Sequence, residues 1–172
     1  FEISSNAILG FDESTMLPIN ADIDSIISVM TNSNSKGSIA MNSVGVSACT
    51  DITGYGLIGH LKEMCESSNV SAEIYGNKVP LIDNLELYAS NDSNIPGGTK
   101  RNFDCFNSYV NYKNDEKNKF IFYDAQTSGG LLISVPEKKL TKLISELKSQ
   151  NSLSHAVIGK VIEKNSNLIT IN

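Results

Sequence analysis

Residues 48–61 read Ala48-Cys49-Thr50-Asp51-Ile52-Thr53-Gly54-Tyr55-Gly56-Leu57-Ile58-Gly59-His60-Leu61 and join a predicted strand to a predicted helix through a glycine turn. Apolar residues alternate with small and polar ones over residues 44–48, a pattern typical of a short half-buried strand. From Leu57 to Cys65, apolar residues recur at i, i+4, i+7 and i+8, so a helix should begin near Gly56 with this face on the core. A strand, a glycine turn and a helix therefore follow one another.

The rest of the chain continues as an irregular mixture of helices and strands. Apolar periodicity predicts helices over residues 22–30, 80–89 and 136–147, and strands over residues 72–75, 131–135, 156–163 and 168–171. Residues 120–123 are predicted to form a short strand or a buried extension. Polar and turn-forming tracts predict loops over residues 31–35, 91–98 and 111–118. Without a repeat or strict βαβ alternation, the pattern favours an α+β fold, with a mixed β-sheet covered by helices in a single domain over residues 1–172.

Composition restricts the classes of partner. The chain has 172 residues, 40% of them hydrophobic and 19% charged, which is typical of a globular domain. Its net charge of −5 repels a phosphate backbone, and its apolar runs are far shorter than the roughly 20 residues of a membrane span, so we expect neither a nucleic-acid nor a membrane partner. Three cysteines without a C-x-x-C pair indicate a reducing compartment, the cytoplasm. Phe1 follows no leader and no initiator Met, so we expect further sequence before it.

The first glycine turn carries an acidic residue that decides between two kinds of site. Residues 54–59 satisfy G-x-G-x-x-G, and Glu73 follows at the distance of a ribose ligand, as in a dinucleotide site. However, Asp51 beside a pyrophosphate would cost about 4 kcal/mol at 4 Å and an effective dielectric near 20. Mg²⁺ between the two relieves this repulsion, so Asp51 is a candidate metal ligand. Alternatively, Asp51 or Thr53 caps the following helix, and both roles can coexist.

Two further turns combine glycines with hydrogen-bonding side chains. Residues 96–102, Pro-Gly-Gly-Thr-Lys-Arg-Asn, have the composition of an anion cradle and equally of an ordinary turn. Residues 124–130, Asp-Ala-Gln-Thr-Ser-Gly-Gly, precede a buried strand, where glycine also permits close backbone packing. Neither His60 nor His155 has a Ser or Cys nucleophile at a recognisable spacing, so we predict packing or surface roles for both and assign no catalytic residue.

Taken together and in this order, the three turns resemble the C-terminal domain of selenophosphate synthetase, also called selenide, water dikinase. The resemblance covers most of the chain, including residues 157–161, Val-Ile-Gly-Lys-Val. It implies the α+β fold of the aminoimidazole ribonucleotide synthetase-like superfamily, and the dinucleotide hypothesis falls away. Tyr55 where the family often has Phe, and Ala125 where Pro is frequent, are mild departures.

The resemblance implies ATP-dependent conversion of selenide and water to selenophosphate, AMP and phosphate, with Mg²⁺ at the polyphosphate. By similarity, Asp51 helps to hold the magnesium at the interdomain nucleotide site. The residues implied to line that site are Gly54, Gly56, Gly97, Gly98, Thr127, Ser128, Gly129 and Gly130. The family's reactive Cys or selenocysteine and its catalytic Lys belong to an N-terminal domain, and no Cys-x-x-Lys occurs here, so we expect this chain to be inactive alone. With that domain it should form a homodimer.

Two other functions remain open. The first is an ATP-using ligase of purine synthesis, which purine-enzyme motifs upstream of Phe1 would indicate. The second is a free-standing, non-enzymatic binding module that keeps the fold for contacts with a partner. Upstream sequence would distinguish all three hypotheses.

Overall fold

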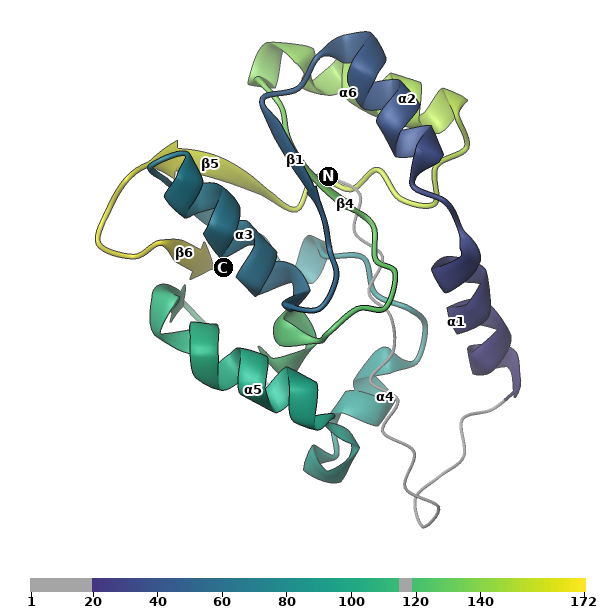
Figure 1. Cartoon of the computed structure of the whole chain (residues 1–172), viewed down its shortest axis with the longest axis vertical. Coiled ribbons are helices and arrows are strands. Elements are labelled where there is room, and N and C mark those ends of the chain that lie inside the picture. Colours follow the sequence, from purple (N-terminus) through teal and green to yellow (C-terminus); the bar gives the residue numbers. More distant parts are fainter. Residues whose placement is uncertain (1–19, 115–118) are drawn as a thin grey trace.

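The computed structural model describes residues 20–114 and 119–172, in which helices and strands alternate irregularly (Figure 1). The helices are α1 (Asn20–Thr31), α2 (Ser35–Val44), α3 (Gly56–Ser67), α4 (Leu85–Ala89), α5 (Gly97–Phe106) and α6 (Glu137–Ser149). The strands are β1 (Ala48–Asp51), β2 (Val70–Ile74), β3 (Val110–Tyr112), β4 (Leu131–Ser134), β5 (Gly159–Glu163) and β6 (Ile169–Ile171). Short 3₁₀ helices cover Gly76–Lys78, Asp92–Asn94, Asn107–Tyr109 and Lys119–Tyr123.

The strands form one mixed sheet and one antiparallel pair. The four-stranded sheet has the order β3-β6-β2-β5, in which β6 runs parallel to both β3 and β2, and β5 runs antiparallel to β2. Strand β1 pairs antiparallel with β4, and Asp51 lies opposite Leu131. The predicted α+β fold with a mixed sheet covered by helices is confirmed.

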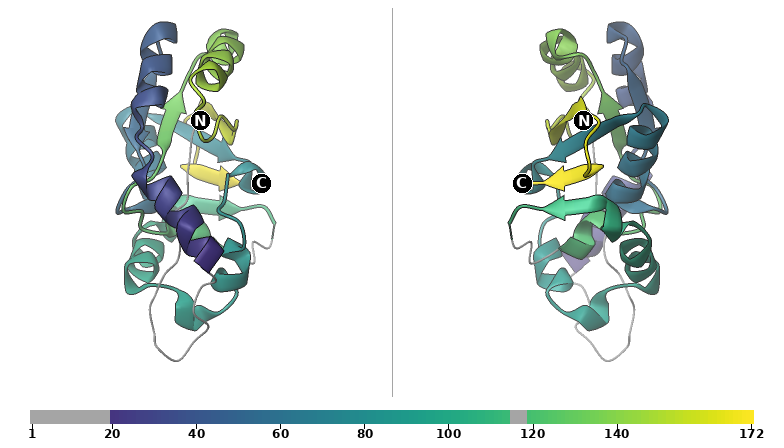
Figure 2. Two further views of the ribbon diagram at one scale, coloured as in Figure 1. Left: turned by 90° about the vertical axis from the view of Figure 1, so that its right-hand side faces the viewer. Right: turned by 90° about the vertical axis from the view of Figure 1, so that its left-hand side faces the viewer.

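Strand β4 separates two apolar clusters because both of its faces are buried. Leu132 joins the main core, which also contains the inward face of α3 and the centre of the four-stranded sheet. Leu131 and Ile133 face the other way and pack with residues of α2 and α6. A continuous apolar run is typical of a strand buried on both faces. Figures 1 and 2 show α2 and α6 side by side, beyond β1 and β4 from the four-stranded sheet.

Two predictions near the N-terminal end are wrong. Residues 35–44 form α2, where the sequence predicted the end of a loop and the start of a strand, and the strand begins only at Ala48. Ala40 and Val44 of α2 are buried against α6. This packing outweighs the weak helix propensity of the Ser and Asn residues in the segment.

Further differences lie between α3 and β4. Helix α5 occupies residues 97–106, where the sequence predicted a turn, and only Leu85–Ala89 of the helix predicted over 80–89 is α-helical. Strand β3 overlaps the start of the predicted loop over 111–118. Residues 120–123 belong to a 3₁₀ helix and not to a strand, although residues 121–123 are buried, as the alternative of a buried extension predicted. Residues 115–118 of that loop, and the chain's beginning at Phe1, lie outside the described residues. Across the described part of the chain, every helix is too short or too polar to span a membrane.

Candidate nucleotide and metal site

The three glycine-rich turns meet at one place, which we call the three-turn junction (residues 51–56, 97–102 and 124–130). The backbone N–H of Gln126 donates to the Thr53 carbonyl at 2.9 Å, joining the third turn to the first. The side chain of Asn102 donates to the Gly54 carbonyl at 2.8 Å, joining the second turn to the first. In Figure 1 the turn after β1 lies beside α5, as these contacts require. Residues up to 79 positions apart are therefore held as one unit.

The first turn depends on the backbone conformation of Gly56. This residue has φ of +67°, a left-handed conformation that side chains disfavour, and α3 begins there. A Cβ at this position would lie 2.6 Å from the carbonyl carbon of Tyr123, so the site has no room for a side chain. Gly56 therefore brings α3 against the segment that leads into the third turn.

The third turn closes on β1 through paired backbone hydrogen bonds. The N–H of Ile52 donates to Gly130 at 2.9 Å, and the N–H of Gly129 donates to Ile52 at 3.1 Å. A Cβ on Gly129 would collide with the Ile52 carbonyl. Gly129 and Gly130 are both buried, whereas Thr127 is exposed and Ser128 half-buried. Packing thus requires glycine at position 129, and Thr127 is, like Ala125, an exposed residue of this turn.

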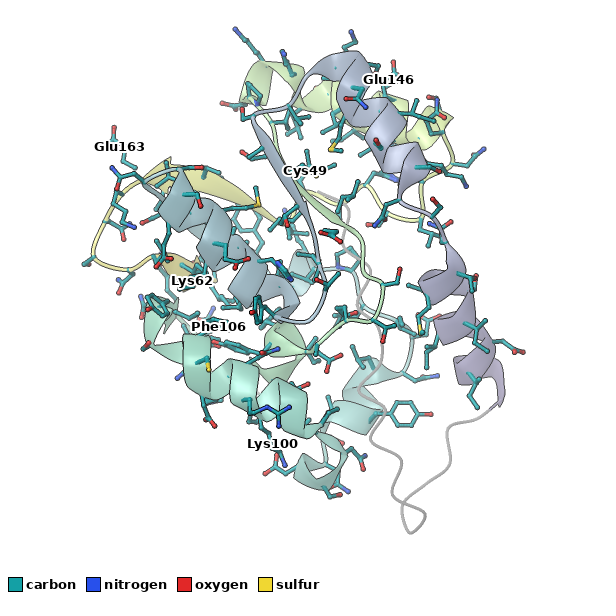
Figure 3. The ribbon with its side chains drawn as sticks, in the orientation of Figure 1. Cys49, Lys62, Lys100, Phe106, Glu146 and Glu163 are labelled. Atoms are coloured by element: carbon teal, nitrogen blue, oxygen red, sulfur yellow. The ribbon has the colours of Figure 1, made fainter. Side chains whose placement is uncertain are left out.

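The second glycine-rich turn forms the N-terminal part of helix α5. This helix packs against α3. A Cβ on Gly59 of α3 would lie 2.8 Å from the ring of Phe106, and this ring also packs edge-on against Tyr55 at 5.8 Å (Figure 3). Pro96 precedes the helix, as its fixed φ favours. Only ordinary contacts would meet a Cβ at Gly97 or Gly98. At these two positions the fold itself does not require glycine.

Asp124 is a buried acid at the centre of the junction, a residue that the sequence did not identify as a separate site. Its carboxylate accepts hydrogen bonds from Thr99 Oγ1 at 2.6 Å and from Gln126 Nε2 at 3.0 Å, and the residue is 4% exposed. Burial raises the pKa of Asp124 to about 6, although hydrogen bonds from Thr99 and Gln126 act in the opposite direction. Asp124 therefore links the second and third turns from inside the protein.

Asp51 lies at the end of β1 with an exposed side chain. Tyr55 occupies the cap position of α3, and no side chain there accepts a hydrogen bond from the first turn of the helix. The alternative that Asp51 or Thr53 caps this helix is therefore wrong. Thr53 instead contacts His60 of α3, with 3.2 Å between Oγ1 and Nε2. The buried His60 ring also has Nδ1 3.4 Å from Glu63 Oε2, a polar role beyond the predicted packing.

The donor groups of this site suit a metal ion that also binds substrate oxygens and water, not one that protein side chains enclose. In residues 20–114 and 119–172, no three His, Cys, Asp or Glu side chains come close enough together to hold a metal. Asp51 is a single exposed carboxylate, which suits Mg²⁺ because this ion commonly takes one or two carboxylates, water and substrate phosphates. A site with three or more His, Cys, Asp or Glu ligands would need at least some of them from outside these residues.

Two other features do not form part of this site. Glu73, the ribose ligand of the dinucleotide hypothesis, pairs instead with Lys160 of β5 at 3.0 Å. A cavity of about 430 Å³ lies between α3 and the β1–β4 pair, with Leu61, Cys65 and Leu132 in its largely apolar lining. It holds none of the polar residues of the three turns. The junction and this cavity are therefore separate features.

Comparison with known proteins identifies the class of domain. Residues 8–171 match the family "AIR synthase related protein, C-terminal domain", and the chain belongs to this family. A crystal structure of a HypE-HypF complex has a chain with the same fold, at a TM-score of 0.52 and 19% identity over 90% of this chain and 38% of that one.

Several curated relatives of the chain are named selenide, water dikinase. The chain is 37% identical over 152 residues to a selenide, water dikinase of Sulfurimonas denitrificans, covering 88% of this chain and 43% of the relative. It is 41% identical over 139 residues to that of Caldanaerobacter subterraneus, covering 80% and 40%. The corresponding enzyme of Aeromonas hydrophila is 41% identical over 123 residues, covering 72% and 35%. The chain thus spans less than half the length of these relatives.

Proposed function

We propose that this chain is the C-terminal domain of a selenide, water dikinase, in which an N-terminal domain completes the active site. The full-length protein would convert ATP, selenide and water to selenophosphate, AMP and phosphate. The similarity to curated dikinases supports this proposal, and so does the presence of the family's three turns in the expected order.

The observation that carries the proposal is the three-turn junction itself. In its first turn the exposed Asp51 comes three residues before Gly54, where a Cβ would meet no atom within 4 Å. An open glycine permits a ligand to approach the backbone closely, and backbone N–H groups bind phosphate oxygens. We propose that Gly54, Gly97, Gly98 and Thr127 face the nucleotide, while Gly56, Gly129 and Gly130 hold the turns in place. Ser128, half-buried, lies between these two groups.

Asp51 would bind Mg²⁺, which supplies positive charge against the polyphosphate. Phosphoryl transfer depends mainly on positioning and on electrostatic stabilisation of the transferring oxygens. The hydrogen bonds of Asn102 and Asp124 position the backbone of the turns before substrate binds, so these residues need not move during the reaction. The nucleophile is proposed to come from the N-terminal domain.

The test is Asp51→Asn in the full-length protein that carries this chain. We expect loss of selenide-dependent AMP formation with an unchanged melting temperature, because the exposed side chain has no role in packing. Glu163→Gln is the matched control, since Glu163 is an exposed acid at the end of β5, away from α5 (Figure 3). Wild-type turnover by Asp51→Asn would remove Asp51 from the site. AMP formation that never depends on selenide would reject the dikinase assignment.

We further propose that the full-length protein is a cytoplasmic homodimer. The resemblance to selenophosphate synthetase supports the dimer, and the absence of C-x-x-C pairs supports a reducing compartment. Light scattering of the purified full-length protein tests the first point, and a fluorescent fusion tests the second.

A further inference from the structure

The apolar cavity between α3 and the β1–β4 pair also reaches the four-stranded sheet. It has a volume of about 430 Å³, and its lining includes Leu61 and Met64 of α3, Leu132 of β4 and Val161 of β5. Every described residue that lines it is uncharged. A cavity of this size and chemistry suits apolar groups, not a phosphate or a metal ion.

Strand β5 has a free edge beside this cavity. In the described part of the chain, β5 pairs only with β2, at one end of the four-stranded sheet. Val161 lies opposite Ala72, and the N–H of Ala72 donates to the Leu168 carbonyl at 3.0 Å instead of to β5. Opposite residues in an antiparallel ladder either exchange both backbone hydrogen bonds or both point away from each other. The N–H and C=O of Val161 therefore point away from β2, toward the free edge.

The side chains of β5 leave this edge without the usual protection. Val161 is apolar and 46% exposed. Lys160 points to the opposite face of the sheet, because side chains alternate along a strand, and its Nζ lies 3.0 Å from Glu73 Oε2. An edge strand with outward backbone groups and an exposed apolar side chain is a template for another strand. The cavity and the edge thus offer an apolar pocket and a backbone partner at one place.

We propose that an extended segment from the N-terminal part of the full-length protein lies in this cavity and pairs with the free edge of β5. In strand addition of this kind, main-chain hydrogen bonds give affinity and pockets for alternate side chains give specificity. The backbone of Val161 pairs with the segment. Apolar residues at every second position of the segment face the cavity, because successive side chains of a strand point to opposite faces.

The occupant is assigned to the same polypeptide because the chain spans less than half the length of its curated relatives. More than half of such a protein lies outside this chain. A short strand binds weakly as a separate molecule, whereas a segment of the same polypeptide has a high effective concentration at its site. The inference rests on the proposed function only in taking an N-terminal domain as part of the protein. It concerns a contact outside the nucleotide site.

The first experiment replaces Val161 with the photo-cross-linking amino acid p-benzoylphenylalanine in the full-length protein. After irradiation, mass spectrometry should identify an intramolecular cross-link to a peptide that precedes Phe1. Replacement of Lys160 in the same way is the matched control, because the neighbouring side chain points to the other face of the sheet. It should not give this cross-link. Cross-links only within this chain or between two copies, or the same product from both positions, would overturn the inference.

The second experiment measures amide hydrogen exchange in the unlabelled full-length protein by nuclear magnetic resonance. The Val161 amide should exchange at least about 100-fold more slowly than an unprotected amide. The amides of Lys160 and Ile162 point toward β2 and report whether β5 itself stays in the sheet. Free exchange at Val161 with protection at both neighbours would show that nothing covers the edge, and the inference would be rejected.

Two variants separate a docked segment from slow exchange of other origin. Val161→Asp places a charge in the apolar cavity, and we expect it to remove the protection at position 161 while Lys160 and Ile162 stay protected. Val161→Thr keeps the branched shape without a charge and should retain protection. Equal protection in the two variants would contradict the docking.

The docking and the dikinase assignment can fail separately. A missing cross-link rejects the docked segment but leaves the selenide-dependent formation of AMP, and its loss in Asp51→Asn, unaffected. AMP formation that never depends on selenide rejects the dikinase assignment but not a cross-link from position 161.

Discussion

Thr99 Oγ1 donates a 2.6 Å hydrogen bond to the buried Asp124 carboxylate and so connects the first turn of α5 to the turn before β4. Hydrogen bonds that involve a charged group are short and strong. Both residues are nearly inaccessible to solvent. This contact therefore fixes the second and third turns relative to each other before any ligand binds.

Asp124 should make the stability of this chain fall as pH rises. Burial raises its pKa from 3.8 to about 6, so between these values the folded state binds more protons than the unfolded state. Stability therefore declines over this range, by about 3 kcal/mol in total. Asp124→Asn removes the titration. Urea unfolding across this range should show the wild type losing about 3 kcal/mol relative to the variant. A constant difference would contradict the buried, ionisable carboxyl.

Thr99→Val should raise the pKa of Asp124 further. The Thr99 hydroxyl donates to the ionised carboxylate and thereby lowers the pKa. Removing the donor favours the protonated form, and the fall in stability should move to higher pH. Carboxyl ¹³C chemical shifts report the titration directly, and Thr99→Ser serves as the control that retains the donor. A lower pKa in Thr99→Val would show that the hydroxyl does not stabilise the charge.

The glycines of the junction should divide into two groups on substitution by alanine. A Cβ at Gly56 or Gly129 would collide with backbone atoms, whereas a Cβ at Gly54 would meet nothing within 4 Å. We expect Gly129→Ala to lose more than about 3 kcal/mol of stability and Gly54→Ala to change it by less than about 1 kcal/mol. Thermal unfolding of the purified variants checks both values.

Gly54→Ala should nevertheless weaken nucleotide binding by the full-length protein, because the added methyl group would occupy the space proposed for phosphate. Equilibrium binding of a fluorescent ATP analogue measures this effect. Exposed Gly97, where a Cβ would approach only the Arg101 side chain at 3.5 Å, provides a parallel test in the second turn. Unchanged affinity in both alanine variants would place the nucleotide elsewhere.

The sequence predicted the elements whose apolar pattern is strong and continuous. The periodic face of α3, the helix after Pro136 and the apolar run of β4 all lie where expected. Helix α5 was missed because Pro-Gly-Gly is also turn chemistry, and little in its composition is apolar. Helix α2 was missed because its stability comes from packing on α6, a contact between distant segments.

The candidate site, like the fold, could be predicted only in part from the sequence. The three turns were recognisable because each concentrates glycine and polar residues in a short stretch. Their connections were not, because Asn102 reaches a carbonyl 48 residues away and Thr99 a carboxylate 25 residues away. Local sequence carries no signal for such contacts. The pairing of Thr53 with His60 spans seven residues but crosses from a turn to a helix, so periodicity did not reveal it either.

Asn102→Asp should destabilise the junction strongly, and less at acidic pH. The Asn102 amide donates to the carbonyls of Gly54 and Tyr123, at 2.8 and 3.0 Å, and the residue is 9% exposed. An ionised aspartate cannot donate, so both carbonyls lose their partner and face a negative charge, at a cost of about 1–3 kcal/mol each. A protonated aspartate restores one donor. Urea unfolding should therefore show a larger loss at neutral than at acidic pH, relative to the wild type at each pH.

Comparison at equal pH cancels the titration of Asp124, which the wild type and the variant share. Asn111→Asp is the matched control, because Asn111 is an exposed residue of β3 and receives the same new charge. Its cost should stay within about 0.5 kcal/mol at either pH. If Asn102→Asp costs no more than Asn111→Asp, the two carbonyl contacts do not hold the first turn against α5, and the rigid junction proposed for nucleotide binding loses its main support.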